Sequence, residues 1–280
     1  MKLIIHGGFL SESDDSEIIQ LKKKDALIEI CTKGYQYLTS HTAVDTVVYT
    51  TCLLEDEPLF NAGTGSQIQS DGKIRMSASL MDGKNCKMSG VINVKNIKNP
   101  IFLAQKLLNE EDRFLSDNGA ENYARIHGLH YYDPEIPQRR NEYIEKVISN
   151  RTSTVGCVCI DSHNNLAAAT STGGKGFEIP GRVSDSSTVA GNYANNYCAV
   201  SMTGVGEDII NAGMAVKIVT RVSDGMNIKE AFEKTFKELE MINGFAGAIA
   251  IDYQGTIHYK DSHPTMVFAS FDGKDFTVFS

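Results

Sequence analysis

An apolar octet near the middle of the chain places the strongest constraint on its fold. Residues 154–161 read Thr-Val-Gly-Cys-Val-Cys-Ile-Asp, and a polar, turn-forming run follows at 162–165. Small and β-branched residues in a short run that is bounded by turn formers predict a buried strand. The preceding residues, 131–153, are polar, include two prolines and have no sustained apolar face, which predicts an irregular connector. A core strand therefore begins abruptly, and its first residue is Thr154.

The position of Thr154 allows a chemical role in one circumstance. The hydroxyl of a threonine inside a chain is a weak nucleophile, but a free α-amine on the same residue can activate it as a general base. A cut between Ser153 and Thr154 would create that amine. A threonine at the start of a strand is commonly structural, so the octet alone favours a structural role.

The segments around this strand add a family resemblance. Downstream are 170–174 (Thr-Ser-Thr-Gly-Gly), 181–186 (Gly-Arg-Val-Ser-Asp-Ser) and 203–207 (Thr-Gly-Val-Gly-Glu), and upstream are 6–8 (His-Gly-Gly) and 54–63 (Leu-Glu-Asp-Glu-Pro-Leu-Phe-Asn-Ala-Gly). In this order, together with Thr154-Val155-Gly156, they resemble the plant-type L-asparaginase and isoaspartyl peptidase family. Members of that family are N-terminal-nucleophile hydrolases.

The expected secondary structure is compatible with the fold that this resemblance implies, an α+β, four-layer αββα sandwich in one domain of residues 1–280. Strands and helices come in blocks, which favours antiparallel sheets with helices outside them. Amphipathic spacing predicts helices at 16–39, 43–54, 100–108, 120–126, 206–222 and 228–242. Alternation and turn signals predict strands at 3–5, 73–81, 88–94, 154–161, 166–172, 197–203, 247–251, 256–259, 266–270 and 276–279.

The resemblance implies that Thr154 is the nucleophile and that the chain frees it by autocatalytic cleavage. The products would be an α subunit of residues 1–153 and a β subunit of residues 154–280. Thr172 would then hydrogen-bond to the nucleophilic hydroxyl, and Asn61 would lie close to it.

An oxyanion hole would come from Thr203 and the N–H of Gly204. The local sequence suits that role, because a strand ends there, glycines leave the backbone accessible, and a helix N-terminus follows. Without the resemblance, Gly204-x-Gly206 would indicate only a turn.

A substrate clamp would come from Arg182 and Asp185, with Gly204 and Gly206 beside them. An arginine offers a planar fork for the α-carboxylate of an amino acid, and an aspartate accepts hydrogen bonds from its α-ammonium. The Arg-x-x-Asp spacing by itself commonly means a surface ion pair of little energetic worth.

No cofactor is required for this chemistry, but the resemblance implies a structural sodium ion. Backbone carbonyls would hold it, and oxygen-only ligation suits a hard cation. The corresponding residues are Leu54, Glu55, Glu57, Phe60, Ala62 and Thr64. Whether potassium activates the enzyme is left open.

Composition excludes other classes of function. The net charge of −8 and the absence of a basic run longer than three residues argue against a nucleic-acid surface. No 18-residue apolar run predicts a membrane span, and the N-terminal apolar run is too short for a signal peptide. The six cysteines are scattered in apolar contexts, which favours reduced core thiols and a cytoplasmic setting.

The sequence therefore predicts an enzyme that hydrolyses the side-chain amide of L-asparagine and the β-linkage of isoaspartyl dipeptides, releasing L-aspartate. Its partners would be a small amino acid or dipeptide substrate and a second cleaved αβ protomer in a dimer. Two related alternatives are a glycosylasparaginase, which the lack of tryptophan disfavours, and a threonine aspartase, which Asp185 disfavours. An uncleaved homologue that only binds ligands is a third, because Phe9, Thr64 and Ser153 depart from the residues usual in the family.

Overall fold

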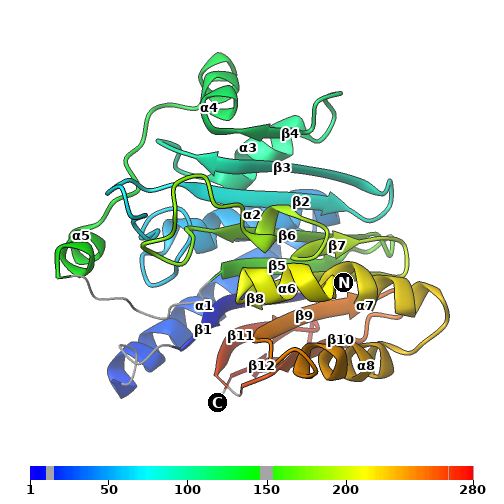
Figure 1. The fold of residues 1–280 in the computed structure, drawn as a ribbon. Coiled ribbons are helices and arrows are strands. Elements are labelled where there is room, and N and C mark those ends of the chain that lie inside the picture. Colours follow the sequence, from blue (N-terminus) through cyan, green and yellow to red (C-terminus); the bar gives the residue numbers. More distant parts are fainter. Residues whose placement is uncertain (11–15, 146–153, 264, 280) are drawn as a thin grey trace.

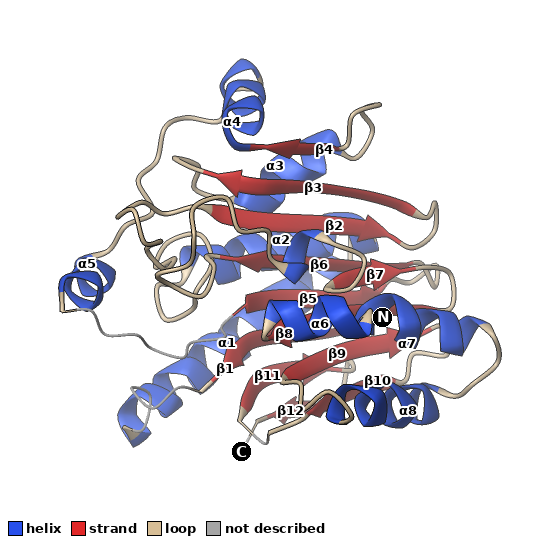
Figure 2. Ribbon diagram, viewed as in Figure 1, coloured by secondary structure: helices blue, strands red, loops and turns tan. Residues whose placement is uncertain are grey.

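Four layers make up the computed structural model, which describes residues 1–10, 16–145, 154–263 and 265–279 (Figure 1). An eight-stranded sheet packs face to face against a four-stranded sheet, and helices cover their outer faces (Figure 2). The expected α+β fold, with helices outside two sheets, is confirmed.

The large sheet has the strand order β12–β11–β1–β5–β6–β2–β3–β4. Its pairs are antiparallel except for β3 with β4. The bounds are β1 Lys2–Phe9, β2 Met76–Asp82, β3 Lys87–Val94, β4 Phe114–Ser116, β5 Thr154–Ile160, β6 Leu166–Thr172, β11 Met266–Phe271 and β12 Phe276–Val278. The central position of β5 places the predicted nucleophile inside the sheet.

The small sheet has the order β10–β9–β8–β7. Its strands are β7 Asn192–Ala194, β8 Cys198–Gly204, β9 Ala246–Asp252 and β10 Ile257–Asp261. The helices are α1 Glu17–Leu38, α2 Ala43–Asp56, α3 Pro100–Leu107, α4 Asp117–Ile126, α5 Pro137–Ile144, α6 Gly206–Ala212, α7 Met214–Ser223 and α8 Ile228–Glu240. Helices α1, α2 and α3 pack on the large sheet, while α7 packs on the small sheet and α8 packs on α7 and β10.

Strands β5 and β6, both predicted from the sequence, pair as a hairpin in which every residue from Thr154 to Ile160 is buried. The turn includes Asn164 with φ +61°, a left-handed conformation that asparagine tolerates. Side chains alternate between the two faces of a strand. On β5, Gly156 faces the small sheet, and the thiol of Cys159 points the other way and donates to the carbonyl of Ala43 on α2.

Several expectations need correction. The predicted helix 206–222 is two helices, because Gly213 adopts φ +57° between α6 and α7. The predicted connector 131–153 contains a helix, α5, although residues 146–153 of it lie outside the described residues. The strand predicted at 3–5 continues through the two glycines to Phe9, and Gly7 is needed because a Cβ there would lie 2.4 Å from the Phe60 ring.

The remaining expectations concern cysteines and membranes. All six cysteines are free thiols, and Cys157 and Cys159 are fully buried in the core as predicted. Across the described part of the chain, no helix combines the length and apolar character that a membrane crossing requires.

Candidate active site

The two predicted catalytic threonines face each other across the β5–β6 ladder. Thr154 is the direct partner of Thr172, and the two hydroxyl oxygens lie 3.4 Å apart. Both side chains are almost completely buried. The structure therefore brings the predicted nucleophile and its predicted neighbour together, and strand pairing alone fixes their relative position.

A second set of polar side chains lies next to the threonine pair, between the two sheets. The hydroxyl of Ser201 on β8 contacts Thr170 Oγ1 at 2.7 Å and His6 Nε2 at 2.9 Å. Gly156 makes room for this contact, because a Cβ there would lie 2.0 Å from Ser201 Oγ and 2.4 Å from His6 Nε2. We call His6, Thr170 and Ser201 the inter-sheet cluster.

His6 is neutral in this environment. Complete burial lowers the pKa of its imidazole to about 3, and the backbone of Thr154 opposes that shift only weakly. A neutral imidazole can accept one hydrogen bond and donate another, but it adds no charge to the site. The sequence analysis gave neither His6 nor Ser201 a chemical role, because their contact joins residues 195 positions apart.

Thr203 and Gly204, the predicted oxyanion hole, end strand β8. Thr203 is fully buried and lies two residues beyond Ser201, so it shares the face that the small sheet turns toward β5. Gly204 has φ +138°, and a Cβ there would lie 2.5 Å from the carbonyl oxygen of Phe245. Only glycine fits this position, and α6 begins two residues later at Gly206.

Asn61 holds the turn that follows Thr172. Its Nδ2 donates to the carbonyl of Gly174 at 2.5 Å, and its Oδ1 accepts the backbone N–H of Gln67 at 2.9 Å. The Gly174 N–H in turn donates to Thr172 Oγ1 at 3.2 Å. Asn61 is therefore connected to the threonine pair through Gly174 and Thr172.

Arg182 and Asp185, the predicted substrate clamp, meet at Gly206. A Cβ on Gly206 would lie 2.8 Å from both Arg182 Nη2 and Asp185 Oδ1, so glycine is required between them. Asp185 is buried, and its Oδ2 has no hydrogen-bond partner among the described residues. Burial raises the pKa of this carboxyl to about 7, although the Arg182 charge acts in the opposite direction.

Glu207 is a member of the site that the sequence analysis missed. Its carboxylate receives two hydrogen bonds from Arg182, from Nε at 2.7 Å and from Nη2 at 2.9 Å. This pairing holds the pKa of Glu207 down at about 2. The available signal was an acidic residue directly after Gly206, in the first turn of α6. Part of the guanidinium fork is thus already engaged before any substrate binds.

The loop between α2 and β2 crowds several backbone oxygens together. Gly63 has φ +53°, and a Cβ added there would lie 2.4 Å from Glu55 O. A Cβ added at Gly65 would lie 2.8 Å from Pro58 O and 3.2 Å from Phe60 O. No group of three or more His, Cys, Asp or Glu side chains in the described ranges could hold a metal. Carbonyl oxygens in a tight loop are the donors that a hard cation takes, so the donor chemistry fits the implied sodium ion.

Two of the six predicted carbonyl donors already have partners. Glu55 O accepts the Thr64 N–H at 2.8 Å, and Glu57 O accepts the Phe60 N–H at 3.1 Å. A carbonyl oxygen has two lone pairs, so each of them retains one for a cation.

The Glu55 side chain has a separate position that the sequence did not predict. It is fully buried, and its Oε1 accepts hydrogen bonds from Ser171 Oγ at 2.6 Å and from the Ile101 N–H at 3.0 Å. Burial raises the pKa of this carboxyl to about 8, against the effect of the Ser171 hydrogen bond. Glu55 therefore ties α2 to β6 and to the first turn of α3, on the face of β6 opposite the threonine pair.

Comparison with known proteins places the chain in a family. The family model described as asparaginase matches residues 1–279. The chain is 46% identical to an isoaspartyl peptidase/L-asparaginase of Synechocystis sp., over 97% of this chain and 88% of the relative. It is 35% identical to an isoaspartyl peptidase of Escherichia coli (91% and 88%) and 32% identical to a plant-type L-asparaginase of Pyrococcus abyssi (95% of each). With its whole length matched, the chain belongs to the asparaginase family of hydrolases.

Proposed function

We propose that this enzyme hydrolyses the side-chain amide of L-asparagine and the β-linkage of isoaspartyl dipeptides, and that it releases L-aspartate. Relatives named for both activities support this assignment. The observation that carries the mechanism is the threonine pair, because Thr154 opens a core strand with its hydroxyl 3.4 Å from that of Thr172.

Activation requires a cut between Ser153 and Thr154. In the continuous chain the nitrogen of Thr154 belongs to a peptide bond and has no basic lone pair. Cleavage converts it into an α-amine with an ordinary pKa near 7.7–8.0, which is well matched to a general base at neutral pH. The mature protein would then consist of residues 1–153 and 154–280.

The reaction itself follows from the amine and the hydroxyl of one residue. The α-amine of Thr154 takes the hydroxyl proton while Oγ1 attacks the substrate carbonyl, and the Thr172 hydroxyl hydrogen-bonds with that oxygen. Thr203 and the Gly204 N–H stabilise the negative oxygen of the tetrahedral intermediate. Collapse of the intermediate expels ammonia or an amino acid, which leaves with the proton, and water then hydrolyses the aspartyl ester.

The clamp selects the aspartyl part of the substrate. Asp185 accepts from its α-ammonium, and the part of the Arg182 guanidinium not engaged by Glu207 binds its α-carboxylate. The unpartnered Oδ2 of Asp185 supports this role, since a buried acceptor without a donor is costly until a ligand supplies one.

Two further parts of the proposal concern assembly. The carbonyl-rich loop of residues 54–64 would hold a structural sodium ion that takes no part in the chemistry, and its role would be to fix the loop that carries Asn61. The cleaved protomers would form a dimer.

An intact-mass spectrum after prolonged incubation tests the proposal. The wild type should give two fragments with the masses of residues 1–153 and 154–280, and it should have asparaginase activity. Thr154→Ala should keep its full length and be inactive. Thr220→Ala is the matched control, because Thr220 is an exposed threonine on α7 and its loss should change neither result. A wild type that stays at full length would refute the N-terminal-nucleophile mechanism for this chain.

A further inference from the structure

Helix α5 is attached to the rest of the molecule in an unusual way. It carries one buried side chain, that of Arg139, and its exposed residues are mostly polar, with the apolar Ile144 also exposed. It stands at the margin of the ribbon, separate from the helix layers (Figure 1). Since apolar burial is small, polar contacts must hold α5 in place.

Residues 132–140 run along the loop of residues 64–72 and contact it repeatedly. The Tyr132 hydroxyl lies 2.9 Å from Thr64 Oγ1, and the Gly65 N–H donates to the carbonyl of Pro134 at 3.1 Å. The buried Arg139 donates from Nε to the carbonyl of Gly65 at 2.7 Å. Both backbone groups of Gly65 are therefore bound by the segment that precedes the predicted cut.

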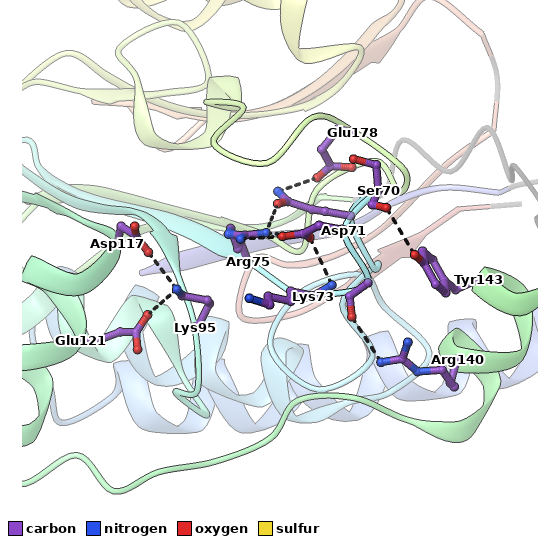
Figure 3. A network of polar contacts seen from close by, with 12 residues as sticks. Ser70, Asp71, Lys73, Arg75, Lys95, Asp117, Glu121, Arg140, Tyr143 and Glu178 are labelled. Carbon is purple, nitrogen blue, oxygen red and sulfur yellow. Dashed lines mark hydrogen bonds and ion pairs between the residues drawn. The ribbon is translucent and has the colours of Figure 1, made fainter.

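The second half of α5 reaches the far end of the same loop. Arg140 Nη2 donates to the carbonyl of Gly72, and the Tyr143 hydroxyl donates to the carbonyl of Ser70, both at 3.3 Å. Figure 3 shows Arg140 and Tyr143 pointing from α5 toward this loop, with Glu178 meeting the loop from another segment.

That other segment, residues 173–181, leads from Thr172 to the predicted clamp. It lies against the loop through two backbone bonds, Phe177 N–H to Ile68 O at 2.9 Å and Ser70 N–H to Glu178 O at 3.1 Å. Tyr143 also stacks directly on Phe177, with ring centroids 5.3 Å apart and an interplanar angle of 12°. We call residues 173–181 the substrate loop.

Phe177 explains why the substrate loop needs this support. Its φ is +55°, in the left-handed region, where a bulky non-glycine residue is strained. Strain of this kind persists only where the surroundings hold the residue in place. The surroundings of Phe177 include the Tyr143 ring and the Ile68 carbonyl.

We propose that residues 132–143 act as a strut that positions the substrate loop, with Tyr143 as the main positioning residue. The inference rests on the proposed function, because it concerns the substrate site of that enzyme. The contacts described above lie outside residues 144–154, so a cut before Thr154 breaks none of them. The strut would then be the C-terminal part of one fragment, holding a loop of the other.

Steady-state kinetics on the processed enzyme test this role. Tyr143→Ala removes the stacked ring, so Arg182 at the end of the loop is held less well; KM for asparagine should rise about 3- to 10-fold while kcat changes less than about two-fold. Tyr143→Phe keeps the ring and loses one hydrogen bond, so it should restore a KM close to that of the wild type. Tyr131→Ala is the control, because Tyr131 is an exposed tyrosine directly before the strut.

Amide hydrogen exchange provides a second readout that does not depend on activity. In Tyr143→Ala, residues 173–181 should exchange faster, while the core of β5 and β6 should exchange as in the wild type. An unchanged KM in Tyr143→Ala, or an equal effect of Tyr131→Ala, would overturn the strut. A wild type that neither cleaves nor hydrolyses asparagine would defeat the proposed function instead, and the exchange comparison would still decide whether Tyr143 orders the loop.

Discussion

The two faces of strand β6 carry different kinds of polar contact. On the face toward the small sheet, Thr172 meets Thr154 at 3.4 Å, and Thr170 belongs to the inter-sheet cluster. On the face toward the helices, Ser171 donates to the buried carboxyl of Glu55 at 2.6 Å. The inner face thus carries neutral hydroxyls and an imidazole, and the outer face carries a carboxyl that joins two helices to the sheet.

The lengths of these contacts suggest different tasks. The 2.6 Å contact at Glu55 is fully formed, as expected of a group that supports the scaffold. The 3.4 Å contact between the threonines is long for a hydroxyl pair, and catalytic hydrogen bonds often tighten only when substrate is bound. We therefore expect inner-face changes to alter the rate and outer-face changes to alter stability.

The largest effect should come from Thr172→Ala. Loss of a hydrogen bond to the attacking oxygen should lower kcat about 10²-fold, with little change in thermal stability, because the side chain is small and both of its partners, the Thr154 hydroxyl and the Gly174 N–H, are neutral. Single-turnover kinetics and a melting curve measure the two quantities. A large fall in melting temperature with a preserved kcat would reverse the assignment of the two faces.

Asp185 sharpens the comparison, since it is a buried carboxyl like Glu55 but lies at the clamp. Asp185→Asn should raise KM for asparagine about 10- to 100-fold, because a charge-assisted hydrogen bond to the substrate ammonium is lost. In the wild type, with a pKa of about 7, the ionised and binding-competent fraction grows as the pH rises. KM should therefore fall from pH 6 to pH 8, and a flat profile would exclude Asp185 as the ammonium acceptor.

Ser171→Ala is the outer-face counterpart of Thr172→Ala and the adjacent residue in the chain. It leaves Glu55 Oε1 with the Ile101 N–H alone, which should lower the free energy of unfolding by about 1–3 kcal/mol. The kcat of the processed enzyme should stay within about two-fold of the wild type. Denaturant unfolding and steady-state kinetics on the same sample check both expectations.

Glu55→Gln should give the most pH-dependent effect. The folded state favours the protonated carboxyl, because its pKa of about 8 lies above the ordinary value of 4.5. That contribution is complete below pH 4.5 and is lost as the pH rises through 8, by at most about 1.4 kcal/mol for each pH unit. The wild type should therefore lose stability relative to Glu55→Gln between pH 5 and pH 8. A stability difference that stays constant over this range would show that Glu55 does not titrate there.

Much of this architecture was predictable from local sequence. The β5–β6 hairpin and the α2 start have local causes: a turn with Asn164, and a Thr42 side chain that caps the helix by accepting the Asp45 N–H. The Thr154–Thr172 contact follows from the same hairpin, since a register that pairs residues 160 and 166 also pairs the two threonines.

The features that the sequence did not predict have two kinds of cause. Some leave no clear local pattern, and others depend on contacts between distant segments. α5 has no apolar face to detect, because a single arginine is its buried residue. Gly213 interrupts an apolar pattern that continues on both sides of it, so the pattern predicted one helix. The Glu55–Ser171 contact spans 116 residues, and the Arg182–Glu207 pair forms only once α6 is placed beside the substrate loop.

The strand order gives the proposed cut a topological consequence. In the large sheet, β1 lies between β11 and β5, and β6 lies next to β2, so strands from before and after residue 154 are interleaved. The two fragments therefore share one sheet. Neither could dissociate from the other without breaking hydrogen-bonded ladders on β1, β5 and β6. The new N-terminus at Thr154 would therefore form on a strand that is already hydrogen-bonded to a neighbour on each side. Separately expressed halves would each lack neighbours for their central strands, so an active enzyme made from two genes would require the halves to fold around each other.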